Sequence, residues 1–139
     1  MYDIAVIGGG PAGLSAAVQA RGRNKSVLVV SGDGRDNPLR KTQRIDNYLG
    51  FPQVSGQELL DRFQTHAAQM GAEQKTGRVL NIMSMGDTFY LSIGSEMEQA
   101  RAIILATGVV WANKYPGEVE LLGSGVSYCA TCDGMLYRN

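Results

Sequence analysis

The chain has 139 residues, of which 44% are hydrophobic and 19% charged, and its thirteen basic residues balance thirteen acidic ones. This length suits one compact unit with its own core, and the balanced charge gives no reason to expect nucleic acid or an anionic membrane surface as a partner. No apolar run approaches the roughly 20 residues that span a bilayer, and no basic segment precedes the first apolar stretch, so we expect a cytoplasmic protein.

The first thirty residues predict a βαβ unit. The apolar run from Tyr2 to Ile7 is typical of a buried parallel strand and ends in glycines. The alanine-rich segment from Leu14 to Ala20 predicts a helix packed closely on that strand. The run from Lys25 to Ser31 predicts a second buried strand, which completes the unit.

The middle of the chain predicts a loop, a helix and three strands. The stretch from Gly32 to Pro52 is polar and glycine-spotted, as in irregular segments that cover a ligand. Ser55 with Glu58 forms a capping box at a helix start, and Gly71 is placed to end that helix. The predicted apolar face of the helix comprises Leu59, Leu60, Phe63, Ala67 and Met70. The strands are predicted from Arg78 to Ser84, Thr88 to Ile93 and Arg101 to Ala106, with a hairpin turn at Gly86-Asp87.

The glycine turn after the first strand indicates a bound dinucleotide. Gly8 allows the sharp turn, Gly10 allows the backbone to approach a pyrophosphate, and Gly13 allows the helix to pack on the sheet. The amides that open the helix then face the phosphates. An acidic residue usually follows the second strand to hold the ribose, but Ser31 stands there instead, and a hydroxyl or backbone contact could replace it.

Cys129 and Cys132 form a Cys-x-x-Cys pair, which is typical of a dithiol that exchanges electrons reversibly. Asp133 is a candidate acid for the departing thiolate. Two other interpretations stay open. Half of a zinc site needs two further ligands, for which the chain offers only His66, interpreted as a solvated surface residue. The dithiol could also be inert.

Four motifs together resemble the low-molecular-weight thioredoxin reductase family, in order and approximate spacing. They are Ile7-Gly8-Gly9-Gly10-Pro11-Ala12-Gly13, Ile45-Asp46-Asn47-Tyr48-Leu49-Gly50-Phe51-Pro52, Ile104-Leu105-Ala106-Thr107-Gly108, and Gly125-Val126-Ser127-Tyr128-Cys129-Ala130-Thr131-Cys132-Asp133-Gly134. The resemblance covers the whole chain but only the first part of a family member. It implies an α/β fold, an FAD/NAD(P)-binding Rossmann-like three-layer domain that is incomplete because its C-terminal strands are missing.

The resemblance also implies the cofactor and the residues near it. The cofactor is FAD, with NADPH expected only for the full-length protein. Residues 1–113 correspond to a partial FAD-binding domain, and residues 114–139 to a linker and the start of a second domain. The pyrophosphate side comprises Gly8, Gly10, Pro11, Ala12 and Gly13; the remaining contacts are Ser31 and Gly32 near the ribose, Val79 at the adenine, Asn47 near the flavin, and Thr107 with Gly108 over the cofactor.

The resemblance implies a redox cycle and leaves the electron donor open. Reduced flavin passes electrons to the disulfide of Cys129 and Cys132, with Cys132 facing the flavin and Cys129 attacking thioredoxin or a similar small disulfide protein. Relatives of this kind are expected to be homodimers, and the present chain is not expected to be active alone. The segment from Asp33 to Lys41 departs from the family's usual Gly-Gly-Gln. A reductase that takes electrons from ferredoxin or another donor, and a non-enzymatic nucleotide-binding fragment, are therefore alternatives.

Overall fold

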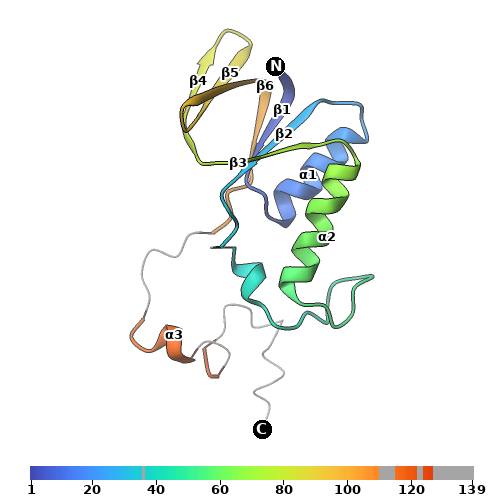
Figure 1. Cartoon of the computed structure of the whole chain (residues 1–139), viewed down its shortest axis with the longest axis vertical. Coiled ribbons are helices and arrows are strands. Elements are labelled where there is room, and N and C mark those ends of the chain that lie inside the picture. Colours follow the sequence, from blue (N-terminus) through green and yellow to red (C-terminus); the bar gives the residue numbers. More distant parts are fainter. Residues whose placement is uncertain (36, 110–114, 122–123, 127–139) are drawn as a thin grey trace.

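The computed structural model describes residues 1–35, 37–109, 115–121 and 124–126. They contain a six-stranded sheet with strand order β3-β2-β1-β6-β5-β4 (Figure 1). The elements in chain order are β1 (Tyr2–Ile7), α1 (Pro11–Arg21), β2 (Val27–Ser31), the short 3-10 helix η1 (Pro38–Lys41), α2 (Gly56–Gln69), β3 (Glu73–Thr76), β4 (Val79–Met85), β5 (Thr88–Ile93), β6 (Glu96–Leu105) and α3 (Glu118–Leu121).

The sheet has a parallel part and an antiparallel part that share one strand. β3, β2, β1 and the second half of β6 pair in parallel, whereas β4, β5 and the first half of β6 form a meander. Ala100 is the residue at which β6 changes partner, because it pairs with Tyr2 of β1 and with Phe89 of β5. The long strand β6 therefore ties the two parts together.

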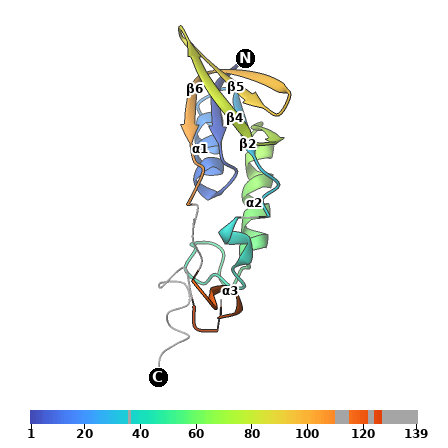
Figure 2. The ribbon, with the colours of Figure 1, turned by 90° about the vertical axis from the view of Figure 1, so that its left-hand side faces the viewer.

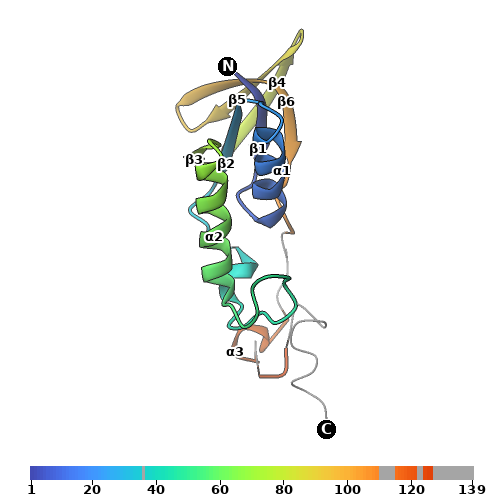
Figure 3. The same ribbon diagram turned by 90° about the vertical axis from the view of Figure 1, so that its right-hand side faces the viewer.

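Two cores follow from the alternation of side chains along the parallel strands. One set faces α1 and α2, which lie side by side on one face of the sheet (Figure 3). This set includes Val6, Val27 and Val29. The other set packs under the meander and comprises Ala5, Leu28, Val30, Leu91, Ile93 and Ala100. Helices, parallel strands and meander form three layers, which follow one another from right to left in Figure 1, and Figure 2 views them from the meander side.

The predicted βαβ unit, the long helix and the hairpin are confirmed. β1 and β5 have the predicted bounds, and the hairpin pairs Met85 with Thr88 across the predicted turn. α1 begins earlier than predicted, at Pro11, because proline suits the first position of a helix. α2 begins after its cap Ser55, whose side chain accepts a hydrogen bond from the Glu58 amide at 3.2 Å.

Other predictions need correction. The Glu58 carboxylate bonds Arg62 at 2.8 Å, so only half of the capping box forms. Met70 is 37% exposed and caps the end of α2, so it does not belong to the apolar face.

β3 was not predicted, because its four polar residues show no apolar alternation. β6 begins at Glu96, well before the predicted strand. η1 interrupts the segment predicted as irregular. Among the described residues, no helix has the length and apolar character needed to cross a bilayer.

Candidate cofactor-binding site

The candidate site lies where the parallel strands end. Gly8 follows β1, Ser31 closes β2, and Ala106 follows β6. Backbone bonds hold these ends in register: the Gly8 amide donates to Val30 at 2.8 Å, and the Ala106 amide donates to Ile7 at 2.8 Å. Ligands of open parallel sheets bind beyond this edge of the strands. The predicted glycine turn therefore lies where such a fold binds its ligand.

Three glycines of the turn are required by close packing. At Gly8, where φ is +122°, a Cβ atom would stand 2.0 Å from the Ala106 carbonyl oxygen. At Gly13 it would stand 1.9 Å from the Gly8 carbonyl oxygen. At Gly9 it would stand 2.8 Å from the Cβ and Oγ atoms of Ser31. The turn is thus pressed against β2, the end of β6 and the base of α1, and any side chain would displace it.

Gly10 differs from these neighbours because a Cβ atom there would make only an ordinary contact. The nearest atom to a Cβ built there is Asn37 Nδ2, at 3.8 Å. Gly10 is also the N-cap of α1, where no side chain accepts a hydrogen bond and the first turn contains no acidic residue. α2, in contrast, has a serine cap and Glu58 in its first turn. The start of α1 is thus left with free N–H groups and the positive end of its dipole, which suits a phosphate group.

The structure brings most of the other predicted residues to the same edge. Ser31 is half-buried at the end of β2, and its carbonyl accepts a bond from the Gly77 amide at 2.8 Å. Val79 opens β4 directly after this contact. Thr107 and Gly108 follow β6, both exposed, with φ of +76° at Gly108. Gly32 is exposed directly after β2.

Asn47 lines a cavity that also borders the glycine turn, at Pro11. Asn47 and Pro11 both line a hollow of about 180 Å³, whose other walls are mostly apolar and aromatic. The remaining lining residues are Leu39, Thr42, Ile45, Tyr48, Leu59 and Phe63. The Tyr48 and Phe63 rings contact each other at a tilt of 54°, with centroids 5.3 Å apart. The hollow lies beside the glycine turn and is lined mostly by apolar and aromatic side chains, as small-molecule sites are.

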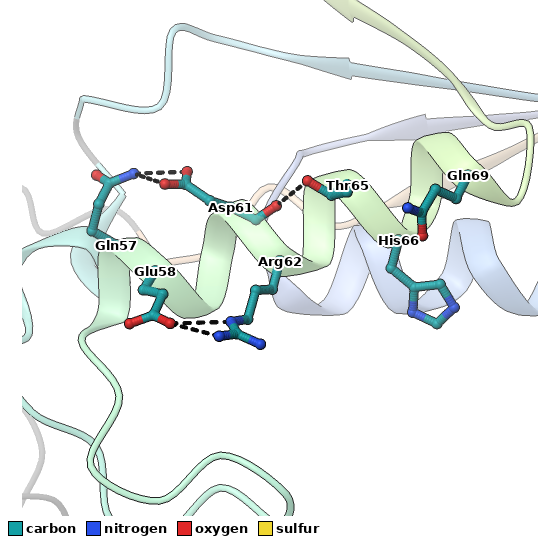
Figure 4. A pocket seen from close by; sticks show the side chains of 7 residues that line it. All are labelled: Gln57, Glu58, Asp61, Arg62, Thr65, His66 and Gln69. Atoms are coloured by element: carbon teal, nitrogen blue, oxygen red, sulfur yellow. Dashed lines mark hydrogen bonds and ion pairs between the residues drawn. The ribbon is translucent and has the colours of Figure 1, made fainter.

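A second hollow, of about 390 Å³, lies on the outer face of α2, and it does not resemble a binding site (Figure 4). Its residues come from this one helix and bond one another: Gln57 donates to the Asp61 carboxylate at 2.7 Å, and Glu58 pairs with Arg62. His66 projects from the same face and is exposed. These are the features of a solvated helix surface.

The groups with shifted pKa values serve the fold. Burial and a hydrogen bond from Tyr2 to Glu73 raise the pKa of Tyr2 to about 12. Hydrogen bonds from the Ser26 backbone and side chain lower the pKa of Asp3. Both residues lie at the amino end of β1, away from the glycine turn. Lys75 of β3 pairs with Glu96 and Glu98 of β6, which raise its pKa and tie the meander across the parallel strands.

The predicted redox residues Cys129, Cys132 and Asp133 lie outside the described residues. In the ranges that the structure describes, no three His, Cys, Asp or Glu side chains form a group that could hold a metal ion. Sequence reasoning missed Gly9 and Asn37. Gly9 is the middle glycine of a Gly-Gly-Gly run, and only its contact with Ser31 reveals its role.

Comparison with curated proteins identifies the relatives of this chain. The thioredoxin reductase of Bacillus subtilis (strain 168) is 37% identical over 139 residues, which is 99% of this chain and 44% of that protein. The thioredoxin reductase of Listeria monocytogenes is 36% identical over 140 residues, again 44% of its length. The chain therefore spans less than half the length of the curated relatives it matches.

Solved structures agree in fold. The thioredoxin reductase of Streptococcus pyogenes MGAS5005 superposes with a TM-score of 0.89 at 34% identity, covering 100% of this chain and 46% of that one. A ferredoxin-flavin thioredoxin reductase of Clostridium acetobutylicum is 50% identical, with a TM-score of 0.74, over 99% of this chain and 48% of that one. The protein-family model of the pyridine nucleotide-disulphide oxidoreductases matches residues 2–139 of this chain. The resemblance to thioredoxin reductases is thereby confirmed, and the chain belongs to the pyridine nucleotide-disulphide oxidoreductase family.

Proposed function

We propose that this chain is the FAD-binding part of a disulfide reductase of the thioredoxin reductase type. The observation that carries the proposal is the uncapped start of α1, with no close contact at Gly10, at the carboxyl edge of the parallel strands. Gly8, Gly9 and Gly13 hold the turn in place by contacts that leave no room for a side chain. The residues present thus fit a dinucleotide, whose pyrophosphate takes the free amides of Ala12 and Gly13.

The remaining contacts are assigned by position along the sheet edge. Ser31 ends β2 and Gly32 follows it, where the ribose of a dinucleotide lies in this type of fold. Val79 stands beside them and offers backbone to the adenine. Asn47 lines the apolar hollow next to Pro11 and orients the flavin. Thr107 and Gly108, which follow β6, form the second turn over the cofactor.

The chemistry resides in the cysteine pair. FAD, when reduced, supplies the two electrons that convert the Cys129–Cys132 disulfide to a dithiol. The Cys129 thiolate then attacks a substrate disulfide, forms a mixed disulfide and releases one substrate thiolate, which Asp133 protonates. Cys132 attacks Cys129 in that mixed disulfide and releases the second substrate thiolate. The Cys129–Cys132 disulfide is restored, and the substrate leaves as a dithiol.

Absorbance and cysteine variants of the intact protein test this proposal. The purified protein is expected to be yellow, or to become so on incubation with FAD. Cys129→Ser and Cys132→Ser are each expected to keep the flavin and to lose reduction of thioredoxin, because either change removes the exchangeable disulfide. A colourless protein that FAD does not convert, or full activity in both variants, would refute the proposal and favour a non-enzymatic nucleotide-binding module.

A second candidate differs in the electron donor. NADPH is the donor expected of thioredoxin reductases, but the 50% identity to a ferredoxin-flavin thioredoxin reductase exceeds the 34% to the Streptococcus pyogenes enzyme. The unusual segment from Asp33 to Lys41 also lies beside the glycine turn. Anaerobic mixing with NADPH, and separately with reduced ferredoxin, distinguishes the donors by loss of the visible flavin band.

The remaining assignments concern organisation. Residues 1–113 form the FAD-binding domain, and residues 114–139 form a linker and the start of a second domain. The intact protein acts in the cytoplasm as a homodimer, with thioredoxin or a similar small disulfide protein as substrate. Sedimentation of the intact protein tests the dimer, since a single species with the mass of one chain contradicts it.

A further inference from the structure

Asn37 is oriented by the short helix that follows it. It is the N-cap of η1, and its side-chain oxygen accepts a hydrogen bond from the Leu39 amide at 3.0 Å. This bond settles which side of the amide is oxygen and which is nitrogen. The oxygen is committed to the backbone, so the NH₂ group points the other way.

The NH₂ group of Asn37 faces the phosphate-binding turn. Nδ2 lies 3.8 Å from the position of a Cβ atom on Gly10, and no other heavy atom comes within 4 Å of that position once the chain neighbours and the backbone of α1 are set aside. Asn37 is half-buried, and Nδ2 makes no hydrogen bond with any described residue. A fixed donor without a partner among the described residues thus lies next to the first residues of α1.

Helix capping alone does not account for an amide at this position. Aspartate and serine cap helices as well as asparagine does, because the cap needs only the oxygen. The NH₂ group is the part that asparagine adds, and it faces a place suited to an anion. A donor that meets a charged acceptor makes a stronger bond than one that meets a neutral group.

We propose that Asn37 is a positioning residue for the cofactor, and that its Nδ2 donates a hydrogen bond to the pyrophosphate of the dinucleotide bound at the glycine turn. This inference rests on the proposed function, because it requires FAD at that turn. It gives the segment from Asp33 to Lys41, which departs from the family's usual residues, a defined role. Asn37 Nδ2 and the first amides of α1 then donate to the same pyrophosphate.

The test is FAD affinity of the intact protein, measured by quenching of flavin fluorescence in two matched variants. Asn37→Asp keeps the cap oxygen but replaces the donor with a negative oxygen, so FAD affinity is expected to fall at least about tenfold. Asn81→Asp is the control, because Asn81 on β4 is exposed and its oxygen likewise accepts a local backbone bond, from Ile82 at 2.9 Å. It is expected to bind FAD as the unaltered protein does.

A second variant keeps the test valid if Asn37→Asp misfolds. Asn37→Ser retains a capping oxygen and removes the longer NH₂ donor without adding charge. The phosphorus NMR signals of bound FAD are expected to shift in Asn37→Ser and to stay unchanged in Asn81→Asp. Equal FAD affinity in Asn37→Asp and Asn81→Asp, or unshifted phosphorus signals in Asn37→Ser, would overturn the inference. Absence of FAD binding by the unaltered protein would instead refute the proposed function itself.

Discussion

Replacing Gly13 by alanine tests the close packing of α1 on the glycine turn. The new Cβ atom would stand 1.9 Å from the Gly8 carbonyl oxygen and 3.1 Å from Val6 Cγ1, whereas real Cβ contacts essentially never fall below 3.0 Å. The first contact is with backbone, so α1 must move outward by about an ångström. Overpacking of this kind costs about 1–3 kcal/mol, against which the helix gains about 1 kcal/mol when alanine replaces glycine. We expect a net loss of up to about 2 kcal/mol in the free energy of unfolding.

Urea unfolding with and without FAD measures this effect. FAD bound at the proposed site is expected to stabilise the folded state by an amount that depends on its concentration relative to its dissociation constant. Gly13→Ala is expected to lose that stabilisation, because the displaced turn no longer presents its amides. Gly22→Ala is the control on the same helix: its φ is −61° and its nearest contact is an ordinary 3.5 Å. A Gly13→Ala protein that retains both its stability and its response to FAD would refute the packing argument.

Three further changes test other contacts. Gly9→Ala is expected to lower stability, because its Cβ would meet Ser31 at 2.8 Å. The loss of stability should be smaller in a Ser31→Gly background, with a coupling of about 0.5–3 kcal/mol in a double-mutant cycle; purely additive effects would contradict the contact. Ser55→Ala is expected to cost about 1 kcal/mol by urea unfolding, since the Glu58 amide loses its acceptor, and an unchanged midpoint would show that the cap contributes nothing. Lys75→Met is expected to lower stability at neutral pH, because it removes the ion pairs with Glu96 and Glu98. The pKa of Lys75 is raised in the folded state, so the loss of stability relative to the unaltered protein should be complete below the ordinary pKa of 10.5 and should decline as the pH rises above it. A loss that persists unchanged at higher pH would exclude the ion pairs as its cause.

The parts of the fold that sequence reasoning predicted are those with a strong local signal. Apolar runs bounded by glycine marked β1 and β2, and the serine at the start of α2 marked its cap. β3 had no such signal. Its side chains are mostly exposed at the edge of the sheet, and it pairs with β2 through backbone atoms that any sequence provides. Polar edge strands of this kind are specified by their neighbours in space.

The candidate site likewise contains residues that the sequence predicted and residues that it did not. The glycine spacing predicted the turn, because each glycine answers a steric need that repeats in every fold of this type. Asn37 could not be predicted, since its role depends on η1 placing it opposite Gly10, across 27 residues of chain. The Pro11–Asn47 cavity likewise joins segments that are distant in sequence. The resemblance to a family suggested Asn47, whereas the chain's own residues gave no sign of it.

The change of partner within β6 has a consequence for the local unfolding of this protein. Ala100 is fully buried, and it belongs at once to the ladder with β1 and to the ladder with β5. The hairpin of β4 and β5 therefore cannot melt as a separate foldon without exposing the edge of β6 that it covers. Amide hydrogen exchange should accordingly report one cooperative unit, in which the protection of Leu91 is lost together with that of Val6.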